Sequence, residues 1–222
     1  MGTLDRVRQF RNYLEKHAAW DSQRGIKLKP YADPMLPHFS ALPVDHQENI
    51  LQNYGRIIDW YEAVGPQAPF DDRREELKSA LASCGMHVHP EALARVGEAS
   101  VYDSYTRYHT LLYMGLPFQS MLSYTLEDVH SIPWYKLYVR DIPSLDRKIM
   151  NVCEELLAGK YPTLVEMNPI IGDYVGYEVA SEKRHAGAFI PEFFAPIYQG
   201  KDIAGFLCVN TAIQIPGEFR WE

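Results

Sequence analysis

Residues 195–210 read APIYQGKDIAGFLCVN. Two apolar runs flank the polar tetrapeptide Gln199–Asp202, which contains a glycine and is a turn signal. This pattern predicts a β-hairpin with strands over Phe189–Tyr198 and Ile203–Thr211. A hairpin this apolar needs further strands beside it and a cover over one face, so we expect an antiparallel sheet with helices on one side and water on the other.

Working outward from the hairpin, the preceding hundred residues mix short strands with helices. We expect strands over Ala99–Asp103, Tyr108–Tyr113 and Thr163–Met167, with a short helix over Phe118–Tyr124. A longer helix is predicted over Leu145–Ala158, because its apolar residues recur at helical spacing and Gly159 follows as a stop.

The first hundred residues have a different, mostly helical pattern. An apolar stripe predicts a helix over Val44–Val64, and similar spacing predicts helices over Thr3–Ala19, over Asp71–Ser83 and around Glu91–Val96. Four prolines between residues 21 and 43 exclude a long helix there. We therefore expect a helical N-terminal region over residues 1–97, followed by an α+β module over residues 98–216.

Several stretches of the second half resemble the PAS domain family. Residues 115–129 read GLPFQSMLSYTLEDV and resemble the PAS pattern N-x-x-F-x-x-x-x-G-Y-[ST]-x-E-E-[LIV], with Ser123 where Gly is usual and Gly115 where Asn is usual. Residues 101–104 resemble the first strand of that family, residues 133–141 its next helix, and the closing hairpin its last two strands. The resemblance implies an α+β fold, with a five-stranded antiparallel sheet flanked by helices and preceded by the α-helical N-terminal region.

The resemblance also implies a function. Proteins with this domain are sensory, signalling or regulatory, and many hold a small molecule between the sheet and the helices. We expect a small apolar ligand here, and output through a homodimer or a partner signalling protein. The side chains expected to line the ligand site, which would fit an ordinary hydrophobic core equally well, are Phe118, Leu122, Trp134, Leu137, Ile149, Cys153, Leu156, Phe194, Phe206 and Cys208.

A small α+β enzyme of ketosteroid-isomerase shape, an isomerase or dehydratase, is the alternative interpretation. The sequence contains no nucleophile elbow, P-loop, dinucleotide fingerprint or zinc-protease motif. No catalytic residue is assigned, because the candidate acids have no paired spacing, although acids scattered in sequence can converge in space. These acids are Asp103, Glu127, Asp128, Asp141 and Glu178.

Cofactor and metal chemistry finds little support in the sequence. Some PAS domains bind haem through a histidine on the long helix, but residues 145–158 contain none, so we expect His109, within a strand, to be a structural or surface residue. The cysteine motif of flavin photosensors is absent, and Cys153 and Cys208 are expected to be buried small hydrophobes. The pair His87 and His89 has no further ligands nearby, so no metal site is assigned. His130, after a short helix, is expected to be exposed.

Composition limits the partners and the compartment. The formal net charge is -7 and there is no long basic run, so direct binding of nucleic acid is not expected. No apolar stretch has the length of a membrane span. The three cysteines, Cys84, Cys153 and Cys208, are far apart and odd in number, which favours reduced thiols in a cytoplasmic protein.

Overall fold

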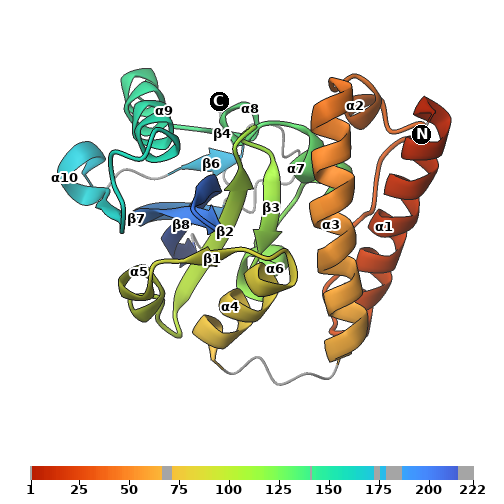
Figure 1. The fold of residues 1–222 in the computed structure, drawn as a ribbon, viewed down its shortest axis with the longest axis horizontal. Coiled ribbons are helices and arrows are strands. Elements are labelled where there is room, and N and C mark those ends of the chain that lie inside the picture. Colours follow the sequence, from red (N-terminus) through yellow and green to blue (C-terminus); the bar gives the residue numbers. More distant parts are fainter. Residues whose placement is uncertain (1, 67–71, 141, 173–175, 179–186, 215–222) are drawn as a thin grey trace.

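The computed structural model describes residues 2–66, 72–140, 142–172, 176–178 and 187–214. Their fold is α+β: a curled antiparallel sheet lies in the middle and helices flank it (Figure 1). The strands run in the order β1-β7-β8-β2-β3, and β5 also pairs with β7. Their bounds are His87–Val88 (β1), Ser100–Thr106 (β2), Leu111–Met114 (β3), Val165–Glu166 (β5), Gly187–Gln199 (β7) and Asp202–Gln214 (β8); a separate pair is formed by Tyr138–Val139 (β4) and Tyr177–Glu178 (β6).

The hairpin predicted from residues 195–210 is confirmed as β7 and β8. Its closing pair is Gln199 with Asp202, and the pairing continues to Gly187 with Gln214. Gly200 in the turn has a φ of 63°, a left-handed conformation that glycine adopts without steric cost. The outer edge of β8 pairs with β2, so the closing hairpin is built into the centre of the sheet.

Each predicted helix has a counterpart in the structure, although several bounds differ. The helix over Val44–Val64 is confirmed as α3, with the predicted bounds, and the long helix of the second half is α9, Pro143–Leu157. The other helices are α1 (Thr3–Gln23), α2 (Pro37–Ser40), α4 (Arg73–Ser83), α5 (Pro90–Ala94), α6 (Leu116–Met121), α7 (Leu126–Ser131), α8 (Trp134–Leu137) and α10 (Asn168–Ile171).

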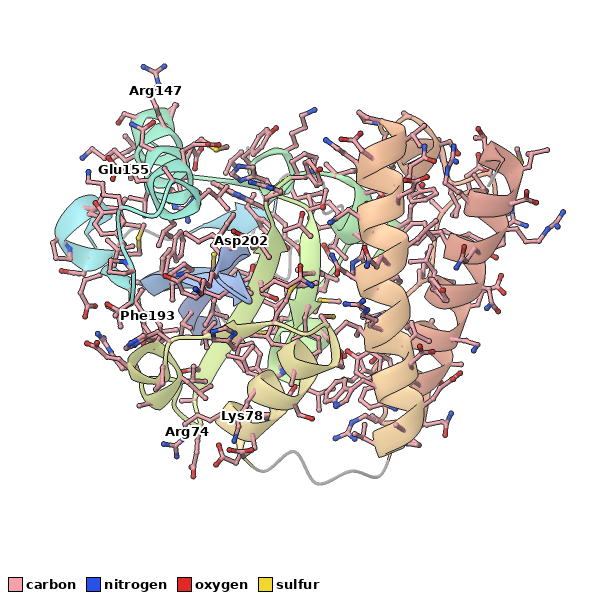
Figure 2. All side chains as sticks on the ribbon, in the orientation of Figure 1. Arg74, Lys78, Arg147, Glu155, Phe193 and Asp202 are labelled. Carbon is pink, nitrogen blue, oxygen red and sulfur yellow. The ribbon has the colours of Figure 1, made fainter. Side chains whose placement is uncertain are left out.

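Helices cover both faces of the sheet, so the expectation of one wet face is wrong. The helix α3 packs on β3, whereas α9 packs on β7 and β8. Consecutive strand residues point to opposite faces, and all seven residues of β2 are buried. In Figure 1, α3 stands next to β3 and α1 lies on the far side of α3, whereas α9 lies beyond the other strands. Figure 2 shows Arg147 of α9 pointing away from the sheet.

The N-terminal helices and the sheet share one hydrophobic core. The buried cluster includes Phe10 of α1, Tyr54 of α3 and Phe206 of β8. The expected N-terminal region also contributes β1, whose residue His87 pairs with Tyr198 of β7. Among the residues that the structure describes, no helix is long and apolar enough to cross a membrane.

Several predicted elements have different bounds in the structure, and local contacts account for the strands on either side of α9. The strand expected over Tyr108–Tyr113 begins only at Leu111, because residues 107–110 form the β2–β3 turn, where His109 has a φ of 63°. The strand expected over Thr163–Met167 is limited to Val165–Glu166, because α10 follows directly and has proline in its first turn. The helix expected over Phe118–Tyr124 ends at Met121.

Candidate functional site

A pocket lies between the sheet and α9. It has about 50 Å³ of free volume, enough for a few water molecules or a very small compound and well below the ~150 Å³ that holds a benzene ring. Residues from four strands, three helices and two connecting segments line it: Asp103, Tyr105, Phe118, Trp134, Tyr138, Arg140, Ile149, Gly176, Phe189, Pro191, Phe194, Cys208 and Asn210.

The strand register brings the sheet side of this pocket together. Asp103 of β2 lies opposite Cys208 of β8, which in turn lies opposite Phe194 of β7. Residues directly opposite one another in a sheet point to the same face. Tyr105 is two residues from Asp103 and therefore shares that face. The floor of the pocket is thus a row of side chains across three strands.

Asp103 is a buried carboxyl group held by two neighbours. Its Oδ1 accepts a hydrogen bond from Asn210 Nδ2 at 3.1 Å, and its Oδ2 accepts a short one from the Tyr105 hydroxyl. Burial raises the pKa of Asp103 from 3.8 to about 7, and the two hydrogen bonds oppose this rise. The group can therefore exchange a proton near neutral pH.

Arg140 supplies a cationic group to the same pocket. Its side chain is only 7 % exposed, and Nη1 donates to Asp146 Oδ1 at 3.0 Å. Its Nε is buried and has no hydrogen-bond partner among the described residues. A Cβ atom at Gly176 would lie 3.3 Å from Nη2, so the glycine allows the guanidinium to approach the backbone closely.

Aromatic rings form much of the remaining wall. Phe118 stacks on Phe189 with centroids 5.0 Å apart, and Tyr138 meets Phe118 edge to face at 6.4 Å. Trp134 is anchored from outside the pocket, since its Nε1 donates to His109 Nδ1 at 3.1 Å.

The contacts of His109 define its tautomer. An indole N–H can only donate, so His109 Nδ1 must be the acceptor. The proton of the neutral ring is then on Nε2, which lies 3.0 Å from Glu154 Oε1. His109 is therefore a structural link between Trp134 and the surface of α9, as expected, although it lies in a turn and not in a strand.

Five of the ten predicted ligand-site residues line the pocket: Phe118, Trp134, Ile149, Phe194 and Cys208. The other five are not part of its lining. Leu137, Cys153, Leu156 and Phe206 are buried in the surrounding core, and Leu122 is half-buried against it.

The polar residues of the pocket were missing from the predicted site. In the sequence, Asp103 is an acid without paired spacing inside the stretch that resembles the first PAS strand, and Arg140 lies within residues 133–141 of the same resemblance. Period-two spacing offers a signal for Asp103, because it falls between Val101 and Tyr105 on one face of a strand. Arg140 follows β4 and carries no comparable signal.

The other candidate acids that the structure describes have hydrogen-bond partners outside the pocket lining. Glu127 accepts from the His38 backbone N–H at 3.1 Å, and Asp128 closes the capping box of α7. Glu178 accepts from the backbone N–H of Ser123 at 3.2 Å and, more closely, from its hydroxyl. Asp141 lies outside the described residues. In the described part of the chain, no group of three or more His, Cys, Asp or Glu residues could hold a metal ion.

A second buried polar cluster lies between α1, α3 and α7. His17 Nδ1 is 2.7 Å from the Tyr54 hydroxyl, and its Nε2 is 3.4 Å from Asp21 Oδ2. Burial raises the pKa of Asp21 to about 8. The expectation that His130 is exposed is wrong: it is only 2 % exposed, because α7 packs against the N-terminal helices. The centroids of the His130 and Tyr54 rings lie 4.0 Å apart.

His87 of β1 and His89, which follows that strand, have different local contacts. His87 stacks on Tyr198, whereas His89 caps α5 by accepting from the backbone N–H of Glu91. Each ring therefore has a structural role in the fold.

Comparison with known proteins leaves the function to be argued from the site: no family model matches the chain, and no curated protein matches it.

Proposed function

We propose that this chain is a sensory or regulatory protein that binds a small molecule in the pocket between its sheet and α9. The observation that carries the proposal is the lining of that pocket, in which aromatic walls enclose a buried carboxyl group and a buried guanidinium. Pockets that combine apolar walls with a few convergent polar groups are typical of small-molecule sites.

The order of elements supports a PAS-like module. Two strands, β2 and β3, are followed by short helices, the longer helix α9, and then β5, β7 and β8. This is the order that the sequence resemblance implies. The pocket lies under α9, where the resemblance places a ligand.

The two-sided cover of the sheet provides a route from the pocket to the N-terminal helices. Asp103 faces the pocket, and its neighbour Tyr102 faces the other side, where its ring lies 6.3 Å from Tyr113. Tyr113 contacts the rings of both Trp60 and Tyr61 on α3. A ligand that moves β2 would therefore displace groups that pack against α3. Output through a homodimer or a partner signalling protein remains part of this proposal.

Native mass spectrometry of the purified protein tests the proposal. We expect a copurifying small molecule, lost in Cys208→Leu, because the larger side chain would fill the free volume beside Asp103. Asp202→Asn is the matched control, since Asp202 is exposed in the hairpin turn, and it should keep the ligand. Thermal unfolding of both variants checks that they fold. Retention of the molecule by a folded Cys208→Leu variant would refute the proposal.

An isomerase-like enzyme is a second candidate, which the environment of Asp103 favours. A carboxyl group with a pKa of about 7 is well suited to accept and return a proton at neutral pH. The test is uptake of deuterium from D₂O into a small ketone at the carbon next to its carbonyl group. Exchange that is catalysed by the protein and abolished in Asp103→Asn would support the enzyme; equal exchange in the two proteins would exclude this role for Asp103.

A further inference from the structure

The pocket presents groups of opposite charge to one small space. Asp103 has two hydrogen-bond partners, whereas an ionised carboxylate has about four acceptor positions, so it can accept further donors. Arg140 has a buried Nε–H without a partner among the described residues, although its Nη1 is engaged by Asp146. The site therefore has unused capacity to accept hydrogen bonds at one group and to donate them at another.

These two groups discriminate between classes of ligand. A hydrocarbon would displace water from Asp103 and Arg140 but could not make the hydrogen bonds that the water made to them. Losing those hydrogen bonds is unfavourable for buried polar groups. A simple amine would match Asp103 and leave Arg140 unmatched, and a simple carboxylate would do the reverse. A molecule with an ammonium group at one end and a carboxylate at the other satisfies both.

The walls and the size of the pocket fit the same class. Trp134, Tyr138 and Phe118 present aromatic rings, which attract ammonium groups through their π faces. The planar guanidinium of arginine matches a carboxylate through paired N–H groups. The free volume of about 50 Å³ restricts the ligand to a few heavy atoms.

We infer that the ligand is a small zwitterionic amino acid, of the size of glycine or alanine, with its ammonium group at Asp103 and its carboxylate at Arg140. This inference rests on the proposed function of the pocket and specifies the class of molecule that the pocket recognises. It replaces the apolar ligand expected from the sequence, because the sequence did not reveal that Asp103 and Arg140 line one pocket.

Calorimetric titration with four probes tests the inference. Glycine and L-alanine carry both charges, whereas ethylamine and propionate carry one each. The wild-type protein should bind the zwitterions at least about tenfold more tightly than either singly charged probe, because each hydrogen-bonded charge contributes a tenfold effect or more. Ethylamine or propionate binding as tightly as glycine would overturn the inference.

Two variants assign the ends of the ligand. Asp103→Asn should weaken glycine and ethylamine binding at least about tenfold and leave propionate unchanged. Arg140→Lys keeps the positive charge but loses the paired N–H groups, and it should weaken glycine and propionate binding while leaving ethylamine unchanged. Arg147→Gln, on the outer face of α9 in Figure 2, is the control and should change none of these affinities.

The outcomes separate this inference from the proposed function. Binding of an uncharged apolar molecule that is lost in Cys208→Leu, together with no binding of glycine or alanine, would overturn the zwitterion and leave the small-molecule site standing. Glycine binding that is unchanged in Asp103→Asn would overturn the assignment of the ammonium end. No binding of any probe, with no copurifying molecule in the wild-type protein, would overturn both proposals.

Discussion

Replacing Asp103 with Asn is expected to make the protein progressively more stable than the wild type as the pH rises from 4 to 8. The wild-type carboxyl group is buried, so it resists ionisation in the folded state, whereas it ionises freely in the unfolded chain. Asn has nearly the same shape but cannot ionise. The comparison therefore isolates the free energy of placing a negative charge at this position.

The expected magnitude follows from the pKa of Asp103. It rises from 3.8 to about 7 on folding, and one pKa unit corresponds to about 1.4 kcal/mol. Between these two values the folded state binds more protons than the unfolded state, so wild-type stability falls as the pH rises through this range. The total loss is about 4 kcal/mol, and it is complete above the folded-state pKa. Asp103→Asn should escape it.

Urea unfolding of both proteins at pH 4.5, 6, 7 and 8 measures the effect. The quantity to plot is the difference between their free energies of unfolding, in which all other titrating groups cancel. Changes in hydrogen bonding to Tyr105 and Asn210 shift this difference by a constant that does not depend on pH. A difference that stays flat across this pH range for Asp103→Asn would refute the reasoning.

Three further perturbations test other parts of the fold. Burial lowers the pKa of His130 from 6.5 to about 4, so the free energy of unfolding of the wild type should fall by about 3 kcal/mol as the pH falls through this range. His130→Gln should remove that loss in urea unfolding. An equal loss in both proteins would contradict this prediction. Gly205→Ala should lower the free energy of unfolding by at least about 2 kcal/mol, because a Cβ would collide with the Tyr105 carbonyl oxygen across the β2–β8 pairing. Gly97→Ala is the control, since a Cβ there would make an ordinary contact at 3.6 Å. Equal free energies of unfolding for the two variants would place the strands in a different register. His109→Asn should lower the free energy of unfolding by about 1–3 kcal/mol, since Asn tolerates the left-handed turn but is too short to accept the hydrogen bond of Trp134. The fluorescence emission of Trp134, measured against a Trp134→Phe reference, should shift as well. Unchanged stability and emission would exclude the link between His109 and Trp134.

Local patterns in the sequence determined many of the elements. The turn at Gln199–Asp202 and the apolar runs beside it predicted the β7–β8 hairpin, because turn geometry depends on adjacent residues. The apolar stripe of α3 and the glycine after α9 likewise defined their helices. Boundaries failed where a neighbouring element intervened, as at the turn around His109 and at the start of α10.

The candidate site was predictable only in part. Phe118, Trp134, Ile149, Phe194 and Cys208 could be named because apolar residues on expected inner faces are recognisable from their spacing. Such spacing cannot separate a pocket wall from ordinary core, so the expected site also includes Leu156 and Phe206, which belong to the core.

Only the tertiary structure decided which residues face one another across the layers. Asp103 and Asn210 are brought together by the β2–β8 register, Arg140 reaches the pocket from the segment between β4 and α9, and the burial of His130 depends on α7 packing against α1 and α3. A sequence pattern reports the environment of a residue averaged over its own helix or strand. Contacts between distant segments depend on the register and packing of whole elements, and those are properties of the assembled fold.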